Sequence, residues 1–505
     1  MSDARALWSA ETGRLRVGGN CLRADAQAEG ADPCQLQRSA GSPPLPLKLD
    51  VHAIAQRSAF MTQYGPSRRA VMLGLAACSA LRPTMSSTRS RCDEPASDNA
   101  TFSLTGPRAE AFGIKEGFPV ADPLLRGQPG EPLDMKYRVG AFSHFDDQYR
   151  THRVARAAAQ WCFTYAVADV HYRYKGADQT IEDYLARQPV TGLLIAKDQT
   201  ILQERYQYGR SDRDRLFSGS MAKSITGLLI GLAIADGSIK SVDDAVQDYV
   251  PELQGTEYGK TSLRDLLHMS SGVKFGEEAN GDQDLDRLWG GMVLGRRSWI
   301  DWLLGRSAPQ RSTIDTISAF NQRIAPAGTE FHYASIEPAV LGLVVERATS
   351  RTLSDYLHEK VWSQIGAEAD GAWLVNAQGG EVAWTFFGAV LRDYARLGRL
   401  LAHDGKWDGR QIIPVQWMIE ATTTRPSDRY LSPGVSSPQA LGYGYLMWLL
   451  PGSRRQFVLL GGYGHRIFID PAAKLIMVQT GVDGSIDQSD EPGRLWAAVV
   501  TKFGR

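Results

Sequence analysis

The stretch Phe217-Ser218-Gly219-Ser220-Met221-Ala222-Lys223-Ser224 decides the fold, because it leads directly into the apolar segment 225–235. No proline occurs between residues 221 and 236, and almost every side chain there is apolar or small. Such a segment predicts a helix that is buried on all sides rather than amphipathic. Gly237 follows it, and glycine is typical of the position just after a helix ends.

Ser220 and Lys223 stand at the start of this predicted helix. Positions i and i+3 share one helical face, so the two side chains can touch. Ser220 would lie at the helix N-terminus, where unpaired N–H groups and the helix dipole favour developing negative charge. A serine becomes a good nucleophile when a nearby base takes its proton, and lysine is such a base where its surroundings lower its pKa. The alternative is a capping serine beside a lysine that reaches into solvent.

Another S-x-x-K match, residues 271–274, lies in a glycine-containing turn with no apolar helix behind it. We interpret it as a chance match. The S-x-x-K pattern alone is therefore weak evidence for a catalytic site.

Tyr333 is the candidate third member of the site. Tyr333 and Tyr430 both have a serine two positions on, but Tyr430 runs into a Pro-Gly turn. Tyr333 instead comes just before a predicted helix start at residues 336–342, with proline in the first turn. A tyrosine held there can point into a cleft; the alternative is a tyrosine packed at a helix entry with its hydroxyl in solvent.

Together these motifs resemble the serine hydrolases of the penicillin-recognising type, which include class C β-lactamases, penicillin-binding DD-peptidases, family VIII esterases and 6-aminohexanoate-dimer (nylon oligomer) hydrolases. The matching features are S-M-A-K at residues 220–223 and Y-A-S at residues 333–335, in the family's order. The sequence around S-M-A-K and at residues 392–398 is most similar to the 6-aminohexanoate-dimer hydrolase branch. The resemblance covers about residue 189 to the C-terminus. It implies that Ser220, Lys223 and Tyr333 are catalytic, that Ser335 lies beside the substrate, and that no cofactor takes part.

The family's third motif, K-T-G or H-T-G, is absent, and Gly461-Gly462-Tyr463-Gly464-His465 stands in its place before a predicted strand at 466–470. These glycines would let a substrate approach the backbone, whose N–H groups could join that of Ser220 in an oxyanion hole. Gly462, Tyr463, Gly464 and His465 are therefore candidate substrate-binding residues. His465 could replace part of the lost positive charge or form an ordinary hydrogen bond.

The missing K-T-G motif also bears on the substrate, because its cation is the usual partner of the β-lactam carboxylate. We therefore expect a serine hydrolase that acts on a small ester or amide. The alternatives are a class C-type β-lactamase or DD-peptidase and, in a different class, a non-catalytic penicillin-binding-like sensor. An α/β-hydrolase is disfavoured because G-x-S-x-G does not occur. Substrate specificity is expected in the loop 277–284 and around Trp289, although the acidic loop could equally be a solvated turn.

Composition argues against two other classes of function. Lysine plus arginine and aspartate plus glutamate both number 56, so the charge gives no indication of nucleic acid binding. Neither H-E-x-x-H nor another zinc-binding spacing is present, so no metal site is predicted. The sequence does not indicate an oligomeric state.

The order of the predicted elements indicates an α/β (α+β) fold of the β-lactamase/transpeptidase type. Predicted strands at 190–196 and 201–208 and several between 443 and 480 enclose a helical region at about 240–385. We therefore expect one antiparallel sheet built from both chain ends and flanked by helices, with an inserted helical lobe. The hydrolase domain would span 151–505, preceded by an extension at 79–150 that wraps it. Residues 153–161 look helical.

The first 78 residues read as a bacterial leader. A second start is plausible at Met61, followed by the twin-arginine-like Ser67-Arg68-Arg69 and the lipobox-like Leu75-Ala76-Ala77-Cys78. This pattern predicts export to the periplasm, or membrane attachment as a lipoprotein through Cys78; a cytoplasmic location is the alternative. If the leader is removed, Cys92 and Cys162 remain, and the sequence does not favour a disulfide between them.

Overall fold

The computed structural model describes residues 99–113, 135–147, 149–277, 284–294, 312–376, 378–424 and 442–505. The chain divides into two units, Met1–Ser86 and Ser87–Arg505, and every described residue belongs to the second. The predicted leader with Met61 and Cys78, residues 278–283 of the acidic loop, and Tyr430 lie outside the described residues.

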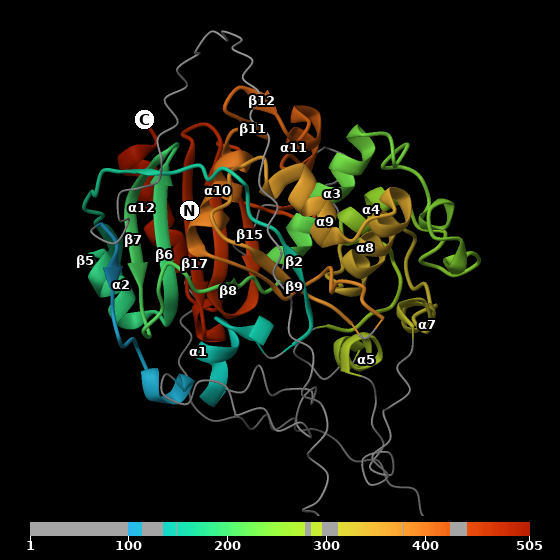
Figure 1. Cartoon of the computed structure of the whole chain (residues 1–505), viewed down its shortest axis with the longest axis horizontal. Coiled ribbons are helices and arrows are strands. Elements are labelled where there is room, and N and C mark those ends of the chain that lie inside the picture. The colour runs from blue at the N-terminus through green and yellow to red at the C-terminus, as the bar shows by residue number, and fades with distance from the viewer. Residues whose placement is uncertain are drawn as a thin grey trace, which may run out of the picture. The chain divides into compact units, whose positions relative to one another are not determined.

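The main sheet has nine strands in the order β1-β7-β6-β17-β16-β15-β14-β13, with β3 also beside β7. The strands are β1 (Thr101–Phe102), β3 (Thr164–Tyr165), β6 (Val190–Lys197), β7 (Thr200–Tyr206), β13 (Gly442–Tyr443), β14 (Trp448–Leu449), β15 (Phe457–Gly461), β16 (His465–Asp470) and β17 (Leu475–Gly481). Strand β6 pairs antiparallel with both β7 and β17, so green and red strands lie side by side in Figure 1. The prediction of one sheet from both chain ends is confirmed. Strands β1 and β3 depart from the predicted antiparallel arrangement, because each of them pairs parallel with β7.

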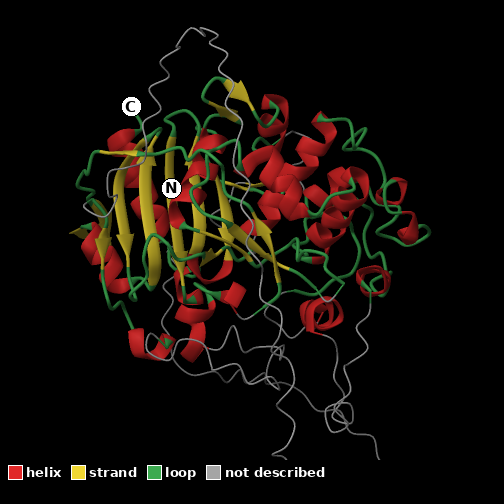
Figure 2. Ribbon diagram, viewed as in Figure 1, coloured by secondary structure: helices red, strands yellow, loops and turns green. Residues whose placement is uncertain are grey.

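Helices cover both faces of this sheet (Figure 2). A Cβ on Gly398 of α10 (Leu391–Ala402) would lie 3.1 Å from Ile467, so this part of β16 contacts α10. The next residue, Phe468, stacks on Trp496 of α12 (Glu491–Phe503), with ring centroids 5.5 Å apart. Neighbouring side chains of a strand point to opposite faces. Strand β16 is therefore apolar at consecutive positions because both of its faces are covered.

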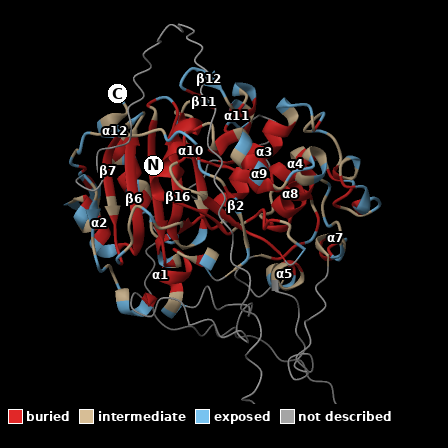
Figure 3. Ribbon diagram, viewed as in Figure 1, coloured by how far each residue is buried: buried red, intermediate tan, exposed pale blue. Residues whose placement is uncertain are grey.

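The inserted lobe is helical, as predicted. Its longest helices are α3 (Met221–Ala235) and α8 (Ile336–Thr349), which pack against each other. The shorter ones are α4 (Leu263–Leu267), α5 (Asp284–Trp289), α7 (Thr313–Ser318) and α9 (Leu353–Leu357). All residues of α3 from Met221 to Ala233 are buried, and this part of the helix is red in Figure 3. The apolar run therefore makes α3 the core of the lobe.

A second, four-stranded sheet was not predicted. Its order is β2-β9-β10-β8, built from β2 (Thr151–Val154), β8 (Leu216–Phe217), β9 (Gly371–Leu374) and β10 (Phe387–Ala389). The helix predicted for 153–161 is wrong, because residues 151–154 pair antiparallel with β9. The alanines there favour a helix locally, but this tertiary pairing overrides a weak preference. The remaining short elements are α1 (Arg138–Ala141), α2 (Ile181–Arg187), α11 (Val415–Ala421) and the ribbons β4 (Tyr172–Tyr174) with β5 (Ala177–Gln179) and β11 (Lys406–Trp407) with β12 (Arg410–Gln411).

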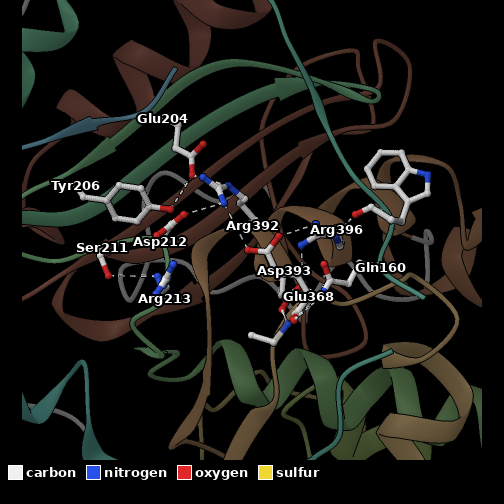
Figure 4. A network of polar contacts seen from close by, with 12 residues as sticks. Gln160, Glu204, Tyr206, Ser211, Asp212, Arg213, Glu368, Arg392, Asp393 and Arg396 are labelled. Carbon is white, nitrogen blue, oxygen red and sulfur yellow. Dashed lines mark hydrogen bonds and ion pairs between the residues drawn. The ribbon is translucent and has the colours of Figure 1, made fainter. Parts of the chain in front are cut away.

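Helix α10 is held by a buried network of charges (Figure 4). Arg392 Nε lies 2.8 Å from Glu204 Oε1 of β7, and Arg396 lies 2.7 Å from Asp393 and 2.8 Å from Glu368. Burial raises the pKa of the Asp393 carboxyl to about 6. Because a buried charge is costly unless it is paired, these contacts fix α10 to the strand and loop that carry its partners.

Within the same turn of α10, Tyr394 connects this anchored helix to the second sheet. Its hydroxyl donates to the Leu216 carbonyl of β8 at 2.8 Å and lies 3.3 Å from the Phe387 carbonyl of β10. Strand β8 leads directly into Ser220. Segment 392–398 thus supports the strand that leads to Ser220.

Two further observations concern Cys162 and the apolar character of the helices. Cys162 takes part in a disulfide bond, although the sequence did not favour one; the other four cysteines lie outside the described residues. Among the described helices, none combines the length and the apolar character needed to cross a membrane.

Helix α11 contacts α3 at Gly231, where a Cβ would lie 2.4 Å from the indole of Trp417. Gly231→Ala should therefore lower the free energy of unfolding by about 1–3 kcal/mol through overpacking, measured by urea unfolding. Gly493→Ala in α12 is the matched control, because nothing lies within 4 Å of its Cβ position. That control should raise the free energy of unfolding by roughly 0.5–1 kcal/mol. Equal stability of Gly231→Ala and the wild type would contradict this packing.

Candidate active site

Ser220 immediately precedes α3 and is half-buried. Gly219 before it has φ +52°, a left-handed conformation that glycine adopts without strain. A Cβ on Gly219 would also lie 3.2 Å from the Cα of Gly461, so a side chain here would crowd the end of β15. This glycine therefore lets the turn present Ser220 at the helix N-terminus, beside strand β15.

Lys223 lies one turn into α3 and is 2% exposed. Its Nζ donates to Ser220 Oγ at 2.7 Å and to the Trp384 carbonyl at 3.3 Å. Both acceptors are uncharged oxygens. The alternative of a lysine reaching into solvent is therefore wrong, and the amine is placed to exchange a proton with the serine hydroxyl.

Tyr333 joins this pair from the segment just before α8. Lys223 Nζ lies 5.0 Å from the centroid of its ring. The ring packs against Trp448, with centroids 5.6 Å apart, and against Tyr443 at 6.5 Å. Three side chains from two helix starts thus meet at one place, as the resemblance implied. The half-buried phenol is held on an aromatic wall from β13 and β14.

Ser335 takes a different role from the one expected. It is 1% exposed, and its N–H and hydroxyl both donate to the Glu277 carboxylate, at 2.5 and 2.6 Å. Ser335 therefore anchors the first residue of the acidic loop instead of facing a substrate. Glu277 had been identified only as part of that loop, because no sequence pattern indicates its partner.

The second S-x-x-K match is a chance match, as interpreted. Ser271 is buried, its hydroxyl accepts the Val273 N–H at 3.1 Å, and its own N–H donates to Glu337. Lys274 is exposed. These contacts give Ser271 a structural role in its turn, and its hydroxyl has no lysine beside it.

The glycine segment that replaces K-T-G lies against the nucleophile. A Cβ on Gly461 would come within 2.4 Å of the Ser218 carbonyl and 2.9 Å of the Ser220 nitrogen. At Gly462, by contrast, nothing lies within 4 Å of the Cβ position, so this residue borders open space. Only glycine allows the backbone at 461 to approach this closely. Gly462 is thus the member of the motif best placed to meet a substrate.

The next two residues do not offer their N–H groups to a substrate. The Tyr463 and Gly464 N–H groups donate to the Asp487 carboxylate, at 2.7 and 3.1 Å. The expectation that Gly464 helps to hold an oxyanion is therefore wrong, because its donor is already used. Asp487 was missed because it lies on a separate loop after β17, and no motif marks it.

His465 is fully buried, with its ring centroid 5.2 Å from that of Phe217 and 5.6 Å from that of Phe142. Burial, and then the charge of Arg466, lower its pKa to about 3, so the ring is neutral at pH 7. Neither ring nitrogen has a hydrogen-bond partner among the described residues. Both expectations for His465, a replacement cation and an ordinary hydrogen bond, are therefore wrong, since its surroundings are aromatic.

The described residues contain no group of three or more His, Cys, Asp or Glu side chains that could hold a metal ion. The candidate site therefore consists of Ser220, Lys223, Tyr333 and the backbone at Gly462.

The sequence profile of the family described as Beta-lactamase matches residues 177–480, which is more than half of the chain. The chain belongs to the β-lactamase family. The matched segment contains S-M-A-K, Y-A-S and the glycine segment 461–465, so the site lies wholly within the β-lactamase domain.

Relatives within the β-lactamase family bear different names. The 6-aminohexanoate-dimer hydrolase of Paenarthrobacter ureafaciens is 25% identical over 305 residues, covering 59% of this chain and 74% of the relative. A β-lactamase of Pseudomonas fluorescens is 32% identical over 115 residues, 20% of this chain and 32% of that protein. A solved Bacillus anthracis structure, provisionally described as a 6-aminohexanoate-dimer hydrolase, has a TM-score of 0.65 at 22% identity and covers 76% of this chain and 97% of its own. The family and branch named from the sequence motifs agree with these matches.

His465 should make the stability of this β-lactamase-family protein depend on pH. The unfolded chain binds a proton near pH 6.5 and the folded chain only near pH 3, so folded stability falls as the pH falls through that window. Between pH 7 and pH 4 the wild type should lose roughly 2–3 kcal/mol more free energy of unfolding than His465→Leu. Urea unfolding at both pH values measures this difference.

His171→Leu is the control, because His171 is exposed. It should show the pH dependence of the wild type. An identical loss in the wild type and His465→Leu would contradict a neutral, buried imidazole.

Proposed function

We propose that this chain is a serine hydrolase that cleaves an ester or amide bond of a small molecule through an acyl-enzyme on Ser220. The observation that carries the proposal is the 2.7 Å contact between Ser220 Oγ and the buried Lys223 Nζ. A serine hydroxyl needs such a neighbouring base to act as a nucleophile. The relative named 6-aminohexanoate-dimer hydrolase supports an amide as one substrate class.

The proposed reaction begins when Ser220 Oγ attacks the substrate carbonyl. Its proton passes to the pair formed by Lys223 and Tyr333, either to a neutral amine or to a phenolate that the ammonium stabilises. The N–H groups of Ser220 and Gly462 donate to the oxyanion of the tetrahedral intermediate. Tyr333 returns the proton to the departing alcohol or amine, and the carbonyl carbon stays bound to Ser220 as an ester.

The second half of the reaction uses water as the nucleophile. The Lys223 and Tyr333 pair takes a proton from water as its oxygen attacks the acyl carbon, and Ser220 Oγ leaves with that proton. The products are a carboxylic acid and the free enzyme. Both halves need the same proton relay, because Ser220 is first deprotonated and then reprotonated.

The surroundings of the site favour an ester or linear amide over a β-lactam. The position of the missing cationic motif is occupied by glycines and by a His465 that is neutral at pH 7. The Arg138 and Arg466 guanidinium groups close to this segment contact the Tyr463 ring and the Asp487 carboxylate. The aromatic wall of Tyr333, Tyr443 and Trp448 instead offers apolar surface beside the nucleophile.

A non-catalytic penicillin-binding-like sensor is the alternative of another class. Such a protein would form the acyl-enzyme and keep it. It would show one burst of product equal to the enzyme concentration and no later turnover, whereas a hydrolase continues to release product after the burst.

Ser220→Ala tests the proposal, because it removes the attacking oxygen and leaves the helix start intact. We expect it to abolish labelling by a fluorophosphonate probe and to lower p-nitrophenyl ester hydrolysis by at least roughly 10³-fold. Labelled protein is detected by intact mass, and the modified residue by peptide mapping. Nitrocefin, assayed in parallel, should be hydrolysed more slowly than the esters by the wild type.

Ser271→Ala is the matched control, since it alters the other S-x-x-K serine. It should retain probe labelling at Ser220. Labelling that persists in Ser220→Ala and maps to another serine would refute the assignment. Nitrocefin turnover faster than ester turnover would instead identify a β-lactamase.

We further propose that the protein is exported, with Cys78 as the candidate lipid-bearing residue. The twin-arginine-like and lipobox-like sequences motivate this, and the disulfide bond at Cys162 supports it, because disulfides persist mainly outside the reducing cytosol. Full-length protein expressed in a bacterium should reach the membrane fraction with a mass that matches cleavage before Cys78 plus acyl chains. Recovery of uncleaved protein in the cytosol would contradict export.

A further inference from the structure

Tyr463 has an unusual backbone conformation beside the active site. Its φ is +66° and its ψ is 21°, the left-handed region that residues other than glycine rarely occupy. This conformation is unfavourable for a residue with a Cβ. It persists only where the surroundings fix it, and such residues cluster at functional sites. The contacts that hold Tyr463 therefore determine how its neighbour Gly462 is presented.

The Asp487 carboxylate holds the Tyr463 turn through its backbone. It accepts the Tyr463 N–H at 2.7 Å and the Gly464 N–H at 3.1 Å. Arg466 donates to the same carboxylate at 2.9 Å and to the Ile486 carbonyl at 3.1 Å. Three donors thus converge on one carboxylate, and two of them belong to the peptide units that follow Gly462.

Arg138 holds the same turn through the Tyr463 side chain. Its guanidinium lies 4.7 Å from the centroid of the Tyr463 ring, a cation–π distance, and its Nη1 donates to the Val482 carbonyl at 3.0 Å. The Phe142 ring packs edge-on against the Tyr463 ring at 5.2 Å. The turn is therefore held by both its main chain and its side chain.

Helix α1, which carries Arg138, also contacts the other half of the site. The Phe142 carbonyl, at its C-terminal end, accepts the Phe217 N–H at 2.7 Å. The rings of these two residues stack, with centroids 4.7 Å apart. Phe217 ends β8, three residues before Ser220. The short helix thus links the approach to the nucleophile with the turn beyond Gly462.

Both holding residues lie outside the segment that matches the β-lactamase family. That segment spans 177–480, whereas Arg138 precedes it and Asp487 follows it. The family's own segment therefore supplies the nucleophile and the glycines, and the flanking parts of this chain supply the contacts that fix them.

We propose that Arg138 and Asp487 are positioning residues that clamp the Tyr463 turn and so aim the Gly462 N–H at the substrate's carbonyl oxygen. This inference rests on the proposed serine hydrolase function and assigns a task to two residues that touch neither the substrate nor the nucleophile. Neither residue exchanges a proton with the substrate. Their effect is on the direction of one backbone donor.

A pair of matched substrates tests the clamp: one p-nitrophenyl ester and its thiono analogue, in which sulfur replaces the carbonyl oxygen. Sulfur is a weak hydrogen-bond acceptor, so only the oxygen ester gains fully from aligned N–H donors. Asp487→Asn places an amide among three donors. We expect kcat for the ester to fall roughly ten- to hundredfold and kcat for the thionoester to fall much less. KM for the ester should change less than about threefold.

The rate ratio of ester to thionoester is the decisive readout. Both substrates are measured on one enzyme preparation, so a smaller folded fraction lowers both rates equally and leaves the ratio unchanged. Asp490→Asn is the matched control, because Asp490 is near in sequence, pairs with Arg494 at the surface, and makes no contact with the turn. It should keep the wild-type ratio.

Arg138→Met is the second variant, and it perturbs the clamp from the opposite side. It should lower the ratio in the same direction, roughly three- to tenfold, because it removes the cation over the ring but keeps an unbranched side chain. It also keeps the clamp testable if Asp487→Asn folds poorly.

Each outcome decides the inference. A lowered ratio in both clamp variants, with a wild-type ratio in Asp490→Asn, supports it. A wild-type ratio in Arg138→Met and Asp487→Asn overturns the clamp and leaves the Ser220 mechanism standing. A wild type that neither labels at Ser220 nor hydrolyses the ester overturns the proposed function, and the clamp with it.

Discussion

The contact between Lys223 and Ser220 is the interaction on which the rest of the structure depends. A lysine that is almost fully buried requires a helix fixed in the core, and α3 meets this need because it is apolar on every side. The helix in turn requires the lobe helices around it and the sheet beside it. The charged network on α10 adds to this support, since Tyr394 holds β8, the strand that delivers Ser220. The Lys223–Ser220 pair thus lies where the helices of the lobe meet the main sheet.

The candidate catalytic side chains and the backbone that faces them come from different parts of the fold. Ser220, Lys223 and Tyr333 lie just before or within α3 and α8, whereas the backbone opposite them comes from the end of β15. Most of α3 and the first ten residues of α8 are buried, but the β15 to β16 connection contains two glycines and a tyrosine in the left-handed conformation. Rigidity on that side comes from outside the connection, through contacts made by α1 and by the loop after β17. Contacts from outside the glycine segment 461–465 therefore fix its backbone, although the segment lacks the cation of K-T-G.

The sequence predicted the parts of the fold that depend on local patterns. The apolar run predicted α3, and Ser220 and Lys223 meet because their spacing suits a helix. It failed where a distant partner decides the outcome. Residues 153–161 favour a helix, yet β9 pairs with their first part. His465 and Ser335 could be assigned only by motif position, because the aromatic rings around one and the Glu277 carboxylate beside the other come from remote segments. Asp487 carries no motif at all.

The pairing of β6 with β17 has a consequence for synthesis on the ribosome. Strand β6 and the helix that bears Ser220 emerge early, whereas β15 to β17 are translated almost last. Until they arrive, β6 has β7 as a neighbour but lacks β17, and the glycine segment does not yet exist. A nascent or prematurely terminated chain therefore carries Ser220 and Lys223 but lacks the glycine segment that faces them. The two halves of the candidate site come together only after the C-terminal strands have been made.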